Sequence, residues 1–156
     1  MSKMFPFLRK FSLAGQINGS LVSEAIAKVE TSTSAEIRVH FTTCPSKLSL
    51  LEEAQTVFNQ LQMHKTESRN GVLVFLRLKS KEIAVIGDEG IHQKVGAEFW
   101  EAVKEEIIET IHSNNLNDGI VRGVEVVGKQ LSKHFPPSAE NPNELSNEVT
   151  SSRGFF

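Results

Sequence analysis

The chain has 156 residues, of which 39% are hydrophobic, 23% charged and 7% aromatic, and this size predicts one domain with a single core. Its 17 Lys and Arg against 19 Asp and Glu leave a net charge of −2, which excludes the strongly basic surface typical of nucleic-acid-binding proteins. A single cysteine cannot form an intrachain disulfide, and no apolar run reaches the ~20 residues of a membrane span.

The amino-terminal segment, residues 1–19, carries early positive charge but lacks the apolar stretch of a secretory signal, because a proline and two basic residues interrupt it. We therefore expect a cytoplasmic protein. Two interpretations of the segment remain open: a frayed end, or a short amphipathic piece that packs on the body of the protein or on a partner. The second would use four apolar side chains, Phe5, Phe7, Leu8 and Phe11.

A helix and a strand open the folded part. Apolar side chains recur at helical spacing over 20–31, which predicts an amphipathic helix with Ser20 as its cap. Apolar and polar side chains alternate over 36–41, which predicts a strand with one face toward the core. The other face, expected to be wetter, carries Glu36, Arg38 and His40; this row is either solvated or covered by a helix.

A second helix and a second strand follow. Ser49 and Glu52 have the spacing of a capping box, ahead of an apolar helical stripe that ends near Met63. The continuous apolar run at 72–76 is typical of a strand that is covered on both faces. Because a helix connects the two strands, we expect them to run parallel.

A hairpin and two long helices complete the predicted domain. The link at 79–81 is so short that the strand at 83–86 must return antiparallel to the preceding strand. Residues 87–91, Gly-Asp-Glu-Gly-Ile, break this third strand. Helical spacing of apolar residues then predicts one helix around 99–111 and a last one around 120–131.

Beyond residue 136 the chain is polar. Two prolines stop the last helix, and residues 137–156 are expected to form a polar tail, on the surface or without order, with a short extended piece at 143–149. The domain is thus expected to span 20–136. Its element order, α-β-α-β-β-α-α, with helices on both faces of the sheet, predicts an α/β fold: a three-layer α/β/α sandwich with a small mixed sheet.

Several phrases of this domain resemble the TPM domain family. Residues 33–39, Thr-Ser-Ala-Glu-Ile-Arg-Val, resemble its T-S-G-E-I-R-V, and residues 63–73 resemble its M-x-x-T followed by N-G-V-L. Residues 86–91 resemble its G-D-x-G-I, and Trp100 and the closing 131–136 also fit. The motifs occur in the family's order and extend over nearly the whole domain, which makes the resemblance specific.

The resemblance implies a compact α/β/α sandwich in a family that includes thylakoid-lumen and photosystem-repair proteins and many bacterial members. For some members it implies divalent cations bound by acidic loops, and for a plant branch an acid phosphatase activity. This chain departs from the pattern at Ala35, where a glycine is usual, and at 15–19, where secreted members carry an Asp-Asp pair.

The strand directions also predict a site. The turn after the third strand should lie at the same sheet edge as the starts of the first two strands. Carboxylate and amide oxygens there suit Ca²⁺ or Mg²⁺, and a bound cation would relieve repulsion among the carboxylates. We therefore predict a divalent-cation site. Its expected ligands are Asp88, Glu89, Glu36 and Asn70, with Thr66 and His92 as neighbours.

A structural interpretation of the same residues stays open. Gly-Asp-x-Gly and Asn-Gly are common turn sequences, in which the Asp side chain bonds nearby backbone and the Gly adopts positive φ. Glu36 would then pair with Arg38 or Arg69.

Two functions from different classes fit the sequence. The first is a non-catalytic binding or adaptor module with a cation-responsive loop, which the lack of a recognisable nucleophile–base pair favours. The second is a weak metal-dependent acid phosphatase, in which the ion polarises a phosphoryl oxygen and activates water. We expect a monomer that contacts a protein partner.

Overall fold

The computed structural model describes residues 2–4, 17–80, 82–113, 116–138 and 144–152. The packing expected for Phe5, Phe7, Leu8 and Phe11 lies outside the described residues and stays a prediction. The described strands are β1 (Ser2–Met4), β2 (Glu36–Thr42), β3 (Gly71–Arg77), β4 (Glu82–Gly87) and β5 (Thr150–Ser151). The described helices are α1 (Gly19–Val29), α2 (Leu50–Gln60), α3 (Glu89–His92), α4 (Ala97–Ser113) and α5 (Leu116–His134).

The strands form one mixed sheet in the order β1-β4-β3-β2-β5. At its centre β2 and β3 run parallel, with Glu36 opposite Gly71, and β4 runs antiparallel to β3, with Gly87 opposite Val72. The short β5 lies parallel to β2 at one edge, and β1 lies antiparallel to β4 at the other. The directions predicted for the three central strands are therefore confirmed.

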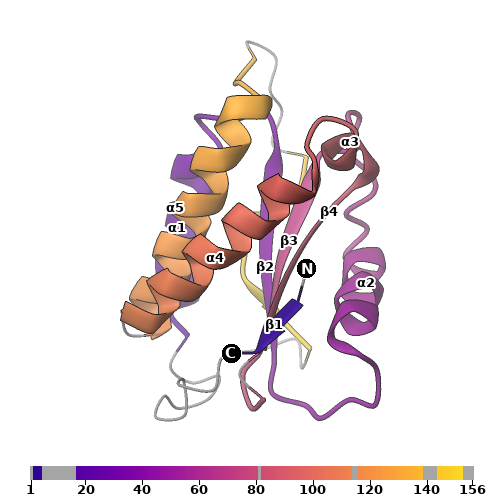
Figure 1. Ribbon diagram of the computed structural model, residues 1–156, viewed down its shortest axis with the longest axis vertical. Coiled ribbons are helices and arrows are strands. Elements are labelled where there is room, and N and C mark those ends of the chain that lie inside the picture. Colours follow the sequence, from indigo (N-terminus) through magenta and orange to yellow (C-terminus); the bar gives the residue numbers. More distant parts are fainter. Residues whose placement is uncertain (1, 5–16, 81, 114–115, 139–143, 153–156) are drawn as a thin grey trace.

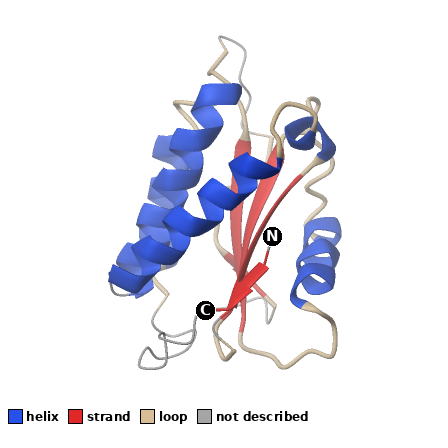
Figure 2. Ribbon diagram, in the orientation of Figure 1, coloured by secondary structure: helices blue, strands red, loops and turns tan. Residues whose placement is uncertain are grey.

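Helices cover both faces of this sheet (Figures 1 and 2): α1, α4 and α5 lie on one face and α2 on the other. Alternation along the strands supplies both layers, because Val72 and Val74 join the core under α1, α4 and α5 while Leu73 and Phe75 join the core under α2. The predicted three-layer α/β/α sandwich with a small mixed sheet is confirmed.

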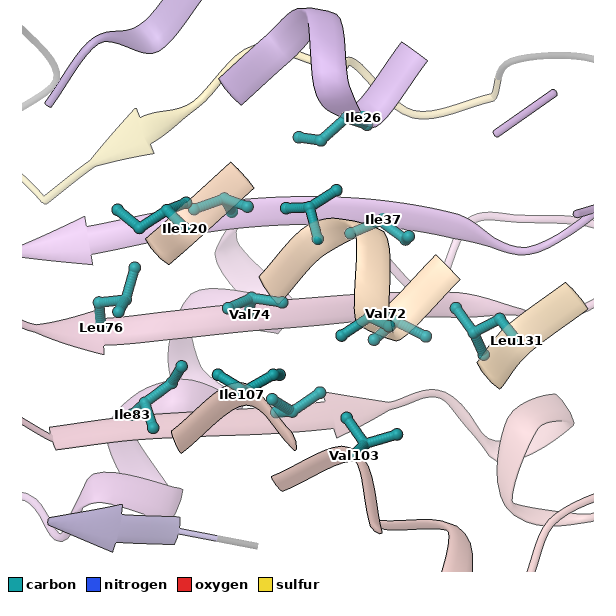
Figure 3. Packing of buried hydrophobic residues seen from close by; sticks show 14 of the residues in the cluster. Ile26, Ile37, Val72, Val74, Leu76, Ile83, Val103, Ile107, Ile120 and Leu131 are labelled. Carbon is teal, nitrogen blue, oxygen red and sulfur yellow. The ribbon is translucent and has the colours of Figure 1, made fainter. Parts of the chain in front are cut away.

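The larger core lies between the sheet and α1, α4 and α5 (Figure 3). Ile26, Ile107 and Leu131, one from each helix, are completely buried over β2, β3 and β4; burying such a side chain contributes about 1.5–3 kcal/mol. Gly128 allows α1 and α5 to pack closely, because any side chain there would clash with Val29.

Two local expectations were wrong. α1 is capped by Asn18, whose side chain accepts the backbone N–H of Leu21 at 3.1 Å, and not by Ser20, which already lies within the helix. Asn18 has an extended backbone, and its own N–H donates to Asn117 Oδ1 at 2.7 Å, which fixes the start of α1 against α5. Ser20 cannot cap because a cap residue must precede the first helical turn.

The second error concerns the outer face of β2. Glu36, Arg38 and His40 were expected to meet a wetter environment, but all three are buried. The cause is the segment 144–152, which follows α5 by ten residues or more and lies along β2. Its Leu145 and Val149 are also buried, and its strand falls at Thr150–Ser151, just beyond the expected extended piece at 143–149.

Candidate functional site

The predicted edge of the sheet, here called the rim, comprises the residues where β2 and β3 begin and β4 ends. Their backbones are directly bonded: Glu36 N–H donates to Asn70 O at 3.1 Å, and Asp88 N–H donates to Gly71 O at 2.9 Å. The start of α3 is attached to the same rim, because Gly90 N–H donates to Arg69 O at 2.9 Å. The rim thus joins three stretches that are distant in sequence.

At the rim, the Asp88 carboxylate is fully engaged. Arg69 donates to both oxygens, from Nε to Oδ2 at 2.7 Å and from Nη2 to Oδ1 at 2.8 Å. The Glu89 backbone N–H also donates to Oδ1 at 2.8 Å, so Asp88 caps α3. Arg69 further contacts the exposed Glu89 carboxylate at 3.3 Å. Arg69 therefore offsets the charge of Asp88, at the place where the sequence predicts a cation.

Glu36 lies on the other side of β3 from Asp88. Both are aligned with Gly71, so their backbones are two strands apart, about 10 Å. The space above Gly71 is filled, because a Cβ there would lie 3.1 Å from Met63 O and 3.5 Å from Leu145 Cδ1. Glu36 Oε1 accepts the Leu145 N–H at 2.7 Å. Burial raises the pKa of Glu36 to about 7, and the nearby Glu144 adds to the rise.

Two further predicted residues stabilise the rim through hydrogen bonds to its backbone. Thr66 Oγ1 accepts the Asn70 N–H at 3.0 Å, and Asn70 Nδ2 donates to Ser34 O at 2.6 Å. Asn70 Oδ1, by contrast, is buried and accepts no hydrogen bond. His92 is exposed, and its ring packs against Trp100 with centroids 5.4 Å apart.

The arrangement holds the predicted residues at one rim without directing their carboxylates to one point. Within the described ranges, no three His, Cys, Asp or Glu side chains are grouped as a metal site requires. Sequence reasoning did not assign Arg69 to Asp88. The available signal was its place beside the Asn-Gly turn; the positive φ of 51° that Arg69 adopts there is seen only in the structure.

A second polar cluster follows the outer face of β2. The His40 ring nitrogens lie within hydrogen-bond distance of Thr150 Oγ1 (2.7 Å) and Ser152 Oγ (3.1 Å). Burial and the neighbouring Arg38 lower the pKa of His40 to about 4, so the ring is neutral at physiological pH. Sequence alternation placed these side chains on one face but gave no sign of the segment that covers them.

A groove of about 510 Å³ runs between α1 and α5, which are parallel. Its floor is apolar, and both walls repeat the same order of charge: an acidic residue followed by a basic residue one turn later. The acidic residues are Glu24 and Glu125, and the basic residues are Lys28 and Lys129. All four are exposed, and no ion pair joins any of them to another described residue.

The fold and the rim define a small α/β/α sandwich protein with an arginine-paired acidic turn. The TPM domain model matches residues 16–130, and the chain belongs to the TPM domain family. The predicted family is therefore confirmed. Among curated proteins, none matches the chain.

Three solved structures share the fold. The NMR structure of the BA42 protein from the psychrophilic bacterium Bizionia argentinensis has a TM-score of 0.82 and 30% identity, covering 90% of this chain and 99% of that one. The N-terminal domain of the cg2496 protein from Corynebacterium glutamicum has a TM-score of 0.58 and 16% identity, covering 80% of each chain. The N-terminal domain of a P. gingivalis protein has a TM-score of 0.63 and 15% identity, covering 78% of this chain and 80% of that one.

No helix in the described parts of the chain combines the length and apolar character that crossing a membrane requires. The expected cytoplasmic location, the monomeric state and the protein partner stay predictions.

Proposed function

We propose that the protein is a non-catalytic binding module that recognises a protein partner through the groove between α1 and α5. The observation that carries this proposal is the contrast between rim and groove. At the rim the groups suited to chemistry are engaged internally, Asp88 by Arg69 and Glu36 by Leu145. In the groove four charged side chains face solvent over an apolar floor.

The charge order defines the partner's chemistry. A docked helix needs apolar residues toward the floor, a basic residue beside Glu24 and Glu125, and an acidic residue one turn away beside Lys28 and Lys129. Such an amphipathic helix fits a groove between two parallel helices. Complementary charges at the periphery of a protein interface chiefly set specificity and association rate.

Charge reversal in cells tests this proposal. The variant E24K/E125K makes the groove wholly basic, and E67K/E105K is the control because it makes the same charge change at exposed sites outside the groove. After chemical crosslinking and mass spectrometry, we expect a partner that wild type and control capture and that E24K/E125K loses. An identical set of captured proteins for all three would exclude the groove as the binding surface.

A metal-dependent phosphatase is the second candidate, and one observation favours it. Asn70 Oδ1 is a buried acceptor without a donor, which is the kind of oxygen that Ca²⁺ or Mg²⁺ binds. For a cation to bind there with Asp88, Glu89 and Glu36 as further ligands, these carboxylates would have to turn away from their present partners, and Arg69 would be displaced from Asp88. If the protein is a binding module, the same cation would bind the acidic turn after β4 without any reaction being catalysed.

Metal titration and an activity assay separate the two functions. If the rim binds a cation, Ca²⁺ or Mg²⁺ shifts the amide resonances of Gly71 and Asp88, and D88N abolishes the shift while its Asn still caps α3. If the protein is a phosphatase, it also hydrolyses a phosphomonoester in a metal-dependent way that D88N removes. Activity that D88N leaves unchanged would come from a contaminant, and a cation shift without activity supports the binding module.

A further inference from the structure

The outer face of β2 contains a buried arginine that the rim and the groove do not use. Register pairs His40 with Thr150, so Arg38 lies opposite Glu148 on the same face. The residue is 8% exposed and its Nε is sealed from solvent. No hydrogen bond or ion pair joins its guanidinium to another residue of the described chain, and Glu148, though close enough to act electrostatically, is exposed and makes no ion pair with it.

This state is unusual within the same molecule. Arg77, also at least partly buried, is fully satisfied: it contacts Glu53 at 2.7 Å and Glu82 at 3.2 Å, and donates to Leu48 O at 2.6 Å. A buried charge without a partner is costly, since desolvation is not offset by attraction or hydrogen bonding. Arg38 therefore reduces stability in the form described, and its Nη1 and Nη2, which are not sealed, can bond a group from outside the described chain.

The neighbours of Arg38 leave its charge available. His40 is neutral at physiological pH, and its ring nitrogens are occupied by the hydroxyls of Thr150 and Ser152. Glu36 is turned to the Leu145 N–H. The planar guanidinium fork matches the paired oxygens of a carboxylate or a phosphoryl group.

We propose that Arg38 is the receptor of an oxyanion, a phosphoryl or carboxylate group, which binds to the terminal nitrogens of its guanidinium beside Glu148. Glu148 acts as a competing carboxylate at the mouth of this site. The site is separate from the groove and from the rim, and it does not depend on the proposed function.

The experiment is an NMR titration of the whole protein with sodium phosphate and, separately, sodium acetate, each against sodium chloride at equal ionic strength. We expect saturable amide shifts confined to residues 37–40 and 148–150. Shifts with phosphate alone identify a phosphoryl site, and shifts with both identify a general oxyanion site. Absence of saturation with either anion, or equal shifts near Lys28 and Lys129, would overturn the proposal.

Three variants make the assignment specific. R38M keeps the volume and removes the charge, so binding should be lost while the melting temperature stays equal or rises, because an unpaired buried charge is gone. A merely structural Arg38 would instead give a lower melting temperature and unchanged binding. R38K keeps the charge without the fork and should weaken binding at least tenfold. E148Q removes the competitor and should tighten binding severalfold; weaker binding in E148Q would contradict the role given to Glu148.

Discussion

Each residue of the Gly87-Asp88-Glu89-Gly90 turn, except Glu89, is required by its packing. A Cβ at Gly87 would lie 2.7 Å from the Trp100 ring. Asp88 caps α3 and pairs with Arg69. A Cβ at Gly90 would lie 2.6 Å from Arg69 O and clash with Ser68 O. A motif that suggests an acidic ligand loop is thus explained at three of its four positions by local structure, which is why the sequence alone left both interpretations open.

Gly90→Ala tests the packing requirement at the residue scale. The added methyl group meets two backbone carbonyls that cannot rotate away, so we expect a loss of about 1–3 kcal/mol in the free energy of unfolding, as for overpacked cores. Urea denaturation measures the loss. Gly19→Ala is the control, because a Cβ there meets nothing within 4 Å and alanine favours the helix. Equal stability of the two variants would show that the rim adjusts freely around residue 90.

At the scale of elements, the periodicity of apolar residues located the long helices and the central strands. α1, α2, α4, α5 and the three central strands were all predicted, and the capping box of Ser49 and Glu52 is confirmed. β1 and α3 were missed, and β5 lies just beyond the extended piece expected at 143–149. Elements of two to four residues have no measurable period, and their pairing partners decide whether they form. The burial of the outer face of β2 depends on residues more than a hundred positions away, such as Thr150.

The buried face of β2 gives an expected pH dependence. Burial raises the pKa of Glu36 from 4.5 to about 7, so the folded protein holds this proton more tightly than the unfolded chain does. Its contribution to the free energy of unfolding is complete below pH 4.5 and is lost as the pH rises to about 7, at about 1.4 kcal/mol per pH unit. His40, with a pKa lowered to about 4, opposes this trend between pH 4.5 and 6.5.

Glu36→Gln isolates the carboxyl from the opposing histidine. Gln cannot ionise and keeps an oxygen for the Leu145 N–H, so the variant should gain stability over wild type by about 3 kcal/mol between pH 4.5 and pH 7. Chemical denaturation at intervals across this range measures the difference. Glu105→Gln, an exposed site on α4, controls for the loss of one charge. A difference between Glu36→Gln and wild type that is constant with pH would contradict the raised pKa.

At the scale of the whole molecule, the strand topology predicted where the rim lies but not which partners its side chains bind. Strand directions alone placed the turn after β4 beside the starts of β2 and β3. Which partner each carboxylate takes depends on Arg69, whose backbone conformation sequence patterns do not reveal, and on the segment 144–152, which supplies the partner of Glu36. The sequence therefore predicted the neighbourhood of the candidate site better than its chemistry.

The same segment decides how far the folded unit extends. The sequence predicts a domain that ends at residue 136 and a polar tail after it, yet Leu145 is only 7% exposed and packs with Met63 and Phe58 in the core under α2. If the segment belongs to the cooperative unit, Leu145→Ala should cost about 2–3 kcal/mol in the free energy of unfolding, as expected for a buried leucine, without changing the steepness of the denaturation curve. Leu51→Ala, at an exposed site on α2, should stay within about 0.5 kcal/mol of wild type. If both variants match wild type, the segment docks without contributing to folding, and the boundary at 136 holds.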